Sequence, residues 1–284
     1  MNLRKEVVRK KLGNLLNMVV ATWNVNSIKV RKDQVLEFLR EVGPDLLALQ
    51  ETKLKTEDFP FQPYQEIGYR VVHSGGKGRN GVALLSKVAP KSIKRGFENT
   101  SEPDSFPDSE ERLIGIEVEG FGFASLLVFS VYIPNGGQPE SDYYYYKISF
   151  LWQLKEFFEK NFSPEDPIIL MGDFNVAPEK EDVFDSVLLE GHICFTEKER
   201  KAFFDLLSFG FYDTLREKHP KDKGIFTWWD YQFGAFKKNH GMRLDHILIT
   251  KPLLERLEEV YVEKRFRAKP KPSDHAPVIA KFLV

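Results

Sequence analysis

The chain has 284 residues, of which 42% are hydrophobic and 29% are charged, and its formal net charge at pH 7 is −1. This length and composition are typical of a folded protein with one large α/β domain or two small ones. The near-zero net charge argues against a protein that binds nucleic acid as a uniform cation, so a phosphate-bearing partner would have to meet a local basic surface.

The first predicted elements alternate between strand and helix. Residues 1–17 have the pattern of a short basic amphipathic helix without the apolar core of a secretory signal, and we predict an extension outside the folded domain. An apolar run predicts a strand at 18–23, and apolar residues at helical spacing predict a helix over 28–42. The Gly-Pro pair at 43–44 would end this helix, and "DLLALQ" predicts the next strand at 45–50.

The later elements continue the alternation. Three further strands are predicted at 81–87, 112–119 and 123–132, and the acidic, proline-rich segment 99–112 is predicted to be a loop. Downstream, the patterns predict two helices and three strands, at 141–161 and 197–209 and at 167–174, 243–250 and 275–283. Because no linker divides the chain, we expect one domain over residues 18–284, built on sheets covered by helices.

Cysteine use and hydropathy limit the cellular setting. The single cysteine, Cys194, rules out an intramolecular disulfide and favours a reducing, intracellular environment. No apolar run has the length that a membrane-spanning helix needs, so no membrane partner is expected.

Polar side chains gather where the apolar runs stop. In "PIILMGDFNVAP", a buried strand delivers Asp173 and Asn175, whose side chains share one face of an extended chain while Phe174 points the other way. Any one such residue is explained by turn formation alone. Six segments show the pattern together, which favours a site mounted at strand ends: Asn24 and Asn26, Glu51, Tyr132 and Asn135, Asp173 and Asn175, Asp245, and Asp274 with His275.

The residue types in this set favour metal-assisted hydrolysis. The chain has no serine-nucleophile motif, no phosphate-binding glycine fingerprint and no paired Cys/His spacing of a zinc site. Hard oxygen ligands dominate, and these suit Mg²⁺ or Mn²⁺. A histidine near carboxylates suits a polarised proton donor. These side chains are therefore the ones expected for metal-assisted phosphodiester hydrolysis.

From Met18 to the C-terminus the chain resembles the exonuclease III class of apurinic/apyrimidinic endonucleases, within the endonuclease/exonuclease/phosphatase superfamily. The resemblance rests on eight motifs in the family's order: "WNVNS", "LQETK", "NGVALLSK", "VYIPNGG", "MGDFNVAP", "TWWDYQ", "GMRLDHIL" and "PSDHAPV". It implies a DNase I-like α/β fold, a four-layer sandwich in which two mixed β-sheets pack face to face with helices outside.

The resemblance also implies roles for the strand-end residues. Glu51, Asn26 and Asp274 would hold divalent metal, Mg²⁺ with Mn²⁺ as an alternative. Asp173 would activate or position the attacking water, aimed by Asn24 and kept ionised by asparagine amides. The other catalytic residues would orient the water or donate hydrogen bonds to the scissile phosphate: Asn175, Tyr132, and His275 oriented by Asp245.

Substrate binding is implied for a further set of residues. An apolar pocket lined by Trp228, Met242 and Leu244, with Asn135 nearby, would accept a flipped-out baseless sugar. The basic stretches 218–223, 236–240 and 264–271, with Lys53, Lys77 and Arg79, would hold the DNA backbone. Each stretch alone is more simply read as solvated surface charge.

The predicted function is a divalent-metal-dependent DNA repair nuclease that hydrolyses the phosphodiester 5′ to abasic sites. Its partner would be duplex DNA with abasic sites or blocked 3′ ends, which it would also trim as a 3′–5′ exonuclease. We expect a cytoplasmic monomer, associated with the nucleoid in a prokaryote. Two alternatives stand beside it: a superfamily phosphodiesterase or phosphatase acting on other phosphate esters, and a catalytically inactive DNA-binding scaffold. The balance of the nuclease activities, the number of metals and the identity of the base stay open.

Overall fold

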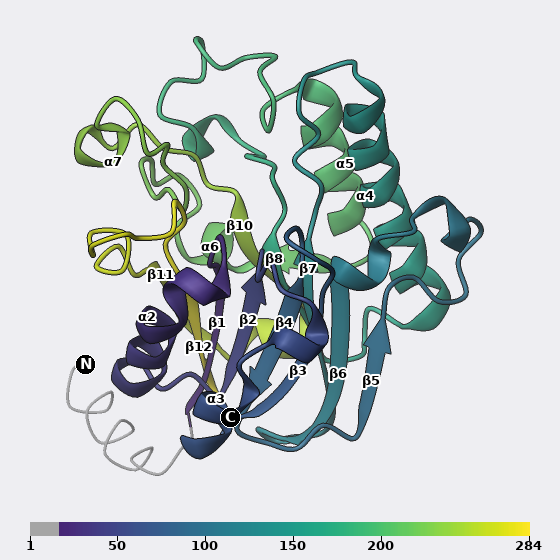
Figure 1. Cartoon of the computed structure of the whole chain (residues 1–284). Coiled ribbons are helices and arrows are strands. Elements are labelled where there is room, and N and C mark those ends of the chain that lie inside the picture. Colours follow the sequence, from purple (N-terminus) through teal and green to yellow (C-terminus); the bar gives the residue numbers. More distant parts are fainter. Residues whose placement is uncertain (1–16) are drawn as a thin grey trace, which may run out of the picture.

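The structure is a computed structural model and describes residues 17–284 (Figure 1). Two six-stranded sheets lie face to face at its centre. The first sheet has the strand order β11-β12-β1-β2-β4-β3 and the second the order β5-β6-β7-β8-β10-β9. Each sheet is mixed, because β1 runs parallel to β2 and β7 runs parallel to β8, whereas the other neighbours are antiparallel.

The strands of the two sheets are short to medium in length. The first sheet comprises β1 (Asn17–Asn24), β2 (Leu46–Gln50), β3 (Arg70–Ser74), β4 (Val82–Ser86), β11 (Leu257–Val262) and β12 (Val278–Leu283). The second comprises β5 (Ser92–Arg95), β6 (Leu113–Gly120), β7 (Phe123–Tyr132), β8 (Ile168–Asp173), β9 (Phe211–Asp213) and β10 (Asp245–Thr250).

Helices cover the outer faces of both sheets. Helices α2 (Ile28–Glu41) and α3 (Phe61–Glu66) pack on the first sheet, and α4 (Asp142–Asn161) and α5 (Glu197–Leu207) pack on the second. Figure 1 shows α4 and α5 side by side, away from α2. Of three short helices, α6 (Thr214–Lys218) and α8 (Lys251–Leu254) contact edge strands of the sheets, whereas α7 (Ala235–Lys238) lies away from them (Figure 1). The predicted four-layer DNase I-like sandwich is confirmed.

Apolar side chains fill three layers of core. Between the sheets, residues such as Val20 and Leu84 of the first sheet meet Val128 and Ile247 of the second. Under α4 and α5 the core is rich in phenylalanine, and the rings of Phe129 and Phe158 meet edge to face with centroids 5.1 Å apart. These strands are buried on both faces, which explains why they read as continuous apolar runs rather than alternating ones.

Most predicted elements are found within a few residues of their predicted limits. The prediction missed two edge strands, β5, which is polar and mostly exposed, and β9, which is buried but only three residues long. It also missed β3, β11 and the four short helices α3, α6, α7 and α8. Residues 1–16 of the predicted extension lie outside the described residues, and Asn17 belongs to β1. None of the helices from residue 17 onward is apolar over a length that would cross a membrane.

Candidate active site

The parallel strand pairs bring the predicted polar residues to one edge of the sandwich. Asn24 ends β1 opposite Gln50, the last residue of β2, and Tyr132 ends β7 opposite Asp173 at the end of β8. Asp245 opens β10, which runs antiparallel to β8 and places this residue opposite Asp173 as well. Because the two sheets pack face to face, the polar ends of both sheets lie together.

The Asn24 amide links the two sheets at this edge. Its Nδ2 atom donates to Glu51 Oε1 at 2.8 Å and to Asp173 Oδ2 at 2.8 Å. Its Oδ1 atom accepts from the backbone N–H of Asn26 at 2.9 Å. Asn24 itself is fully buried, so these three hydrogen bonds of its amide leave little freedom to the carboxylates on either side.

Asp173 and Asn175 form a tight local unit. The backbone N–H of Asn175 donates to Asp173 Oδ1 at 2.9 Å, and Asn175 itself has a left-handed φ of 50°. Its side-chain Nδ2 atom donates to the carbonyl of Ile133 at 2.9 Å, while its Oδ1 atom accepts from Asn135 Nδ2 at 3.2 Å. Phe174 points the opposite way and packs on Phe203. The left-handed turn therefore lets Asp173 and Asn175 face the same space.

His275 is held between two buried carboxylates. Its Nδ1 atom lies 2.7 Å from Asp245 Oδ2, and its Nε2 atom lies 3.7 Å from Asp173 Oδ2. Burial alone would lower the pKa of His275, but the carboxylates of Asp245 and Asp173 outweigh burial and raise the pKa to about 10. The imidazole is therefore protonated at neutral pH and can donate a hydrogen bond from Nε2.

The charge state of Asp173 differs from the expectation that asparagine amides keep it ionised. The Asn24 amide does lower the pKa of Asp173, but burial has the larger effect and raises the pKa to about 7, with His275 opposing the rise and Asp245 adding to it. The expectation omitted the desolvation of a carboxylate that is only 1% exposed. A pKa near neutrality suits a group that takes up a proton during a reaction.

Asp274 and Tyr132 line the same pocket as Asp173 and His275. Asp274 accepts from Asn26 Nδ2 and from the indole Nε1 of Trp228, each at 3.0 Å. Although burial opposes ionisation, the charge of His275 and the Trp228 hydrogen bond hold the pKa of Asp274 below its usual range. Burial, with the charges of Glu51 and Asp173, raises the pKa of Tyr132 well above its usual value. The Tyr132 hydroxyl therefore stays protonated and can serve as a donor.

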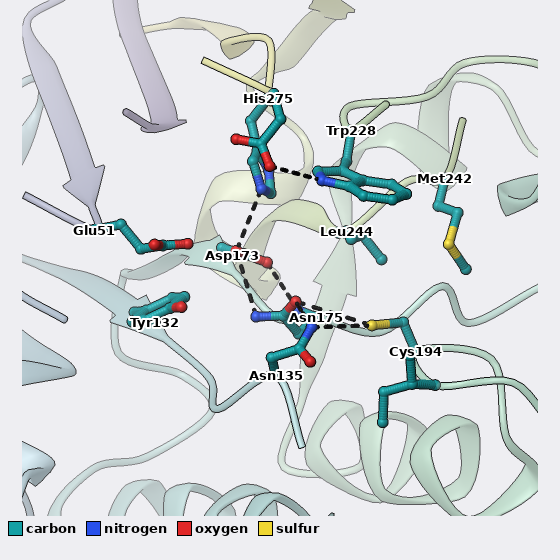
Figure 2. A pocket seen from close by; sticks show the side chains of 12 residues that line it. Glu51, Tyr132, Asn135, Asp173, Asn175, Cys194, Trp228, Met242, Leu244 and His275 are labelled. Atoms are coloured by element: carbon teal, nitrogen blue, oxygen red, sulfur yellow. Dashed lines mark hydrogen bonds and ion pairs between the residues drawn. The ribbon is translucent and has the colours of Figure 1, made fainter. Parts of the chain in front are cut away.

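A pocket of about 370 Å³ opens above these groups. Figure 2 shows Asp173 at its centre, with Glu51 and Tyr132 on one side and Trp228, Met242 and Leu244 on the other. Ten of the predicted site residues line it, namely Glu51, Tyr132, Asn135, Asp173, Asn175, Trp228, Met242, Leu244, Asp274 and His275. The other predicted residues, Asn24, Asn26 and Asp245, do not line the pocket, but each hydrogen-bonds to a residue that does.

The pocket edge offers oxygen ligands to a cation. Lys53 Nζ lies 3.0 Å from Glu51 Oε2 and also donates to Asn26 Oδ1, so an ammonium group stands between the two predicted metal ligands. This pair of oxygens therefore accommodates a positive charge, and hard oxygen donors are those that Mg²⁺ prefers. Ligand atoms of Asp173, Asp245 and His275 also lie within 4.8 Å of one another, which is compatible with a metal site.

Some residues of the site were not found by sequence reasoning. Ile193 and Cys194 line the pocket but belong to an irregular loop that carries no motif. Lys53 was expected to hold DNA but contacts the predicted metal ligands. Lys147 lies in the pattern of α4 between Tyr144 and Leu151, which are both buried, and a lysine on the apolar face of a helix was a signal that could have been used.

The chain is similar in sequence to a known enzyme family and to a known nuclease. The family described as "Endonuclease/Exonuclease/phosphatase family" matches residues 21–275. Exodeoxyribonuclease III of Haemophilus influenzae is 35% identical over 272 residues, which cover 93% of this chain and 100% of that protein.

Two solved structures share the fold closely. An AP endonuclease from Archaeoglobus fulgidus has a TM-score of 0.87 and 39% identity, covering 94% of this chain and 100% of the other. A 3′ phosphatase from Neisseria, bound to a product DNA hairpin, has a TM-score of 0.85 and 36% identity, covering 93% of this chain and 99% of the other.

Proposed function

The chain belongs to the endonuclease/exonuclease/phosphatase family, and we propose that it is a DNA repair nuclease of the exonuclease III class. It hydrolyses the phosphodiester 5′ to abasic sites in duplex DNA and also removes nucleotides or blocking groups from 3′ ends. The observation that carries this proposal is the buried cluster around Asp173 beside an apolar-walled pocket, in which Asn24 donates to Asp173 and His275, held by Asp245, lies 3.7 Å away. The relatives named above are nucleases and phosphatases of DNA, which supports the substrate.

The polar side of the pocket carries the chemistry. Asp173, aimed by the Asn24 amide, positions the attacking water and takes its proton, and its raised pKa suits that transfer. Asn175 orients the water or contacts the phosphate. Tyr132 and the His275 imidazolium, held by Asp245, donate to the nonbridging oxygens as negative charge builds there.

The metal-binding role falls to Glu51 and Asn26, with Asp274 at a second position. A divalent ion, Mg²⁺ or Mn²⁺, supplies charge stabilisation to the phosphate and the leaving oxygen when it is bound. The arrangement of Lys53 between Glu51 and Asn26 supports a cation position there. Asn26 and Trp228 hold Asp274 in place.

The apolar side of the pocket selects the substrate. Trp228, Met242 and Leu244 form a wall that would receive a sugar without a base, whereas a complete nucleotide needs more room. Asn135 would contact the same nucleotide from the opposite side. We place the catalytic domain at residues 18–284 and expect a monomer that works inside the cell, consistent with the single cysteine.

Incision of a defined duplex tests the proposal. The purified full chain is incubated with a duplex that carries one tetrahydrofuran abasic analogue, in Mg²⁺ and in Mn²⁺, and the products are mapped at nucleotide resolution. We expect a single cut 5′ to the analogue that leaves a 3′ hydroxyl. Parallel duplexes with a nick and with a 3′ phosphate measure the other two activities. Absence of incision with both metals, or faster turnover of a phosphoinositide than of DNA, would refute the proposal.

A further inference from the structure

A buried ion pair lies beneath the pocket and takes no part in the proposed chemistry. Lys147 of α4 and Glu199 of α5 contact each other through Nζ and Oε1, and both side chains are 0% exposed. Neither residue lines the pocket. Burying two charges is costly, and well-packed apolar residues often serve stability equally well. The hydrogen bonds that the pair makes therefore suggest what it does beyond holding two helices together.

The ammonium group of Lys147 anchors two loops that carry pocket residues. Its Nζ atom donates to the backbone carbonyl of Asn135 at 3.0 Å and to that of Asn175 at 2.7 Å. With Glu199 as the third partner, all three of its donors are used. Asn135 follows β7 and Asn175 follows β8, so one side chain joins the ends of both strands at the pocket floor.

Glu199 extends the same anchor to the pocket wall. Its Oε1 atom accepts from the backbone N–H of Cys194 at 3.0 Å. Its Oε2 atom accepts from the N–H and hydroxyl of Thr196 at 2.9 and 2.8 Å, which closes the capping box at the start of α5. The ion pair thus connects the asparagine loops to the segment that carries Cys194.

The anchored residues have backbones that need support. Asn175 has a φ of 50° and Cys194 a φ of 69°, both in the left-handed region that non-glycine residues seldom adopt. Such conformations persist only where the surroundings hold them. Lys147 thus holds the backbone carbonyl of Asn175, and the side chain of the same residue contacts Asn135 and Asp173.

We propose that the Lys147–Glu199 pair positions the loops that carry Asn135 and Asn175, and that Lys147 is a positioning residue for the reaction. The inference rests on the proposed nuclease function. The ammonium group sets the peptide planes of Asn135 and Asn175, so the two amides meet and face the bound phosphate. Without it, the left-handed turn at Asn175 relaxes, and the side chain leaves the place from which it serves the attacking water.

The test separates positioning from stability by removing both charges together. In Lys147→Met/Glu199→Gln no unpaired charge is left in the core, so the variant avoids the main cause of unfolding. We expect kcat on the abasic duplex to fall about 100-fold, the loss typical of a misplaced catalytic group, with KM within about threefold of wild type. Glu199→Gln alone keeps the two hydrogen bonds from Lys147 to the asparagine carbonyls. It leaves the buried ammonium group without its carboxylate, so it costs more stability than the double change. Measured on the folded protein, we expect about a tenfold loss of kcat.

A double-mutant cycle with Asn175 distinguishes positioning from stability. It compares the loss of kcat caused by removing the ion pair in the presence and in the absence of the Asn175 side chain. If Lys147 acts through Asn175, the charge-removing double substitution should cost less than about threefold in kcat when Asn175→Ala is already present. Leu154→Ala, a buried change two turns further along the same helix that removes no hydrogen bond to the asparagine loops, is the matched control and should lower stability while keeping kcat.

Different results would contradict the positioning role of the ion pair and the proposed nuclease function. Wild-type kcat in the folded charge-free variant or in Glu199→Gln would overturn the inference, as would losses that are equally large with and without Asn175. A rise in KM alone would also overturn it, because it would assign the pair to substrate binding. Failure of the wild-type protein to cut the abasic duplex is a different result, and it would refute the proposed function instead.

Discussion

Replacing Asp245 with asparagine tests whether this carboxylate keeps His275 protonated during the reaction. In the wild-type protein, His275 Nδ1 lies 2.7 Å from Asp245 Oδ2, and both side chains are buried. Despite burial, the carboxylates of Asp245 and Asp173 raise the pKa of His275 to about 10. The protonated donor is therefore present at neutral pH, and activity should decline on the alkaline side only as the pH approaches 10.

The size of the effect follows from the charge that is removed. Two opposite unit charges about 4 Å apart at an effective dielectric constant of about 20 attract by about 4 kcal/mol. At about 1.4 kcal/mol per pH unit, this loss lowers the pKa of His275 by about 3 units, to near 7. The pKa of His275 falls rather than rises, because the Asp245 carboxylate stabilises the protonated imidazolium. Without that carboxylate, His275 loses its proton at a lower pH. Asp245 also raises the pKa of Asp173. Its removal should therefore shift the acidic side of the pH–activity profile to lower pH as well.

The assay is a pH profile of kcat/KM on a tetrahydrofuran abasic duplex, which resists alkaline strand cleavage. In Asp245→Asn we expect the alkaline limb to begin about 3 pH units lower, so the variant loses far more activity at pH 9 than at pH 6. Asp222→Asn is the matched control, because it removes the carboxylate partner of the half-buried His219 outside the pocket. A uniformly slower variant with an unmoved alkaline limb would refute the role of the His275 imidazolium.

Four further predictions follow from the same structure. Asp173→Asn should lower cleavage about 1000-fold while duplex binding in a gel-shift assay is unchanged, because the group that takes the proton is lost but no DNA contact is removed. EDTA should abolish cleavage, and Glu51→Gln should raise the Mg²⁺ concentration for half-maximal rate at least about tenfold in a metal titration, since a ligand charge is lost. Trp228→Ala should lower the preference for abasic over intact duplex about tenfold in competition kinetics, because the pocket wall is opened. Leu154→Ala should cost about 2–5 kcal/mol in urea unfolding through the cavity it leaves in the core under α4.

The strand ends of the site could be predicted because the signal is local. An apolar run that stops at Asp173 or Asn24 marks the end of a buried strand, and the position of the polar residue along the chain is enough to find it. The resemblance of the motifs to the exonuclease III class then assigned roles to these positions. Short edge strands such as β5 and β9 escaped because few of their residues are buried or because they span too few residues to show a period.

The contacts that organise the site could not be predicted in the same way. Lys147 meets Glu199 only because α4 and α5 pack side by side, and 52 residues separate them along the chain. Cys194 reaches the pocket wall from a loop without a motif. Lys53 lies beside the predicted metal ligands because the turn after β2, with positive φ at Glu51 and at Lys53 itself, brings its side chain back toward Asn26.

By itself, the sequence determined the strands, most of their ends and the chemical types delivered there, because these depend on residues that are neighbours in the chain. The tertiary structure decided which of these residues meet. Asn24 and Asp173 are 149 residues apart and join only because the two sheets pack face to face. It also decided their charge states, because the pKa values of Asp173 and His275 depend on burial and on carboxylates from other strands. Proton affinity at this site is a property of the packed molecule, and no local pattern of residues encodes it.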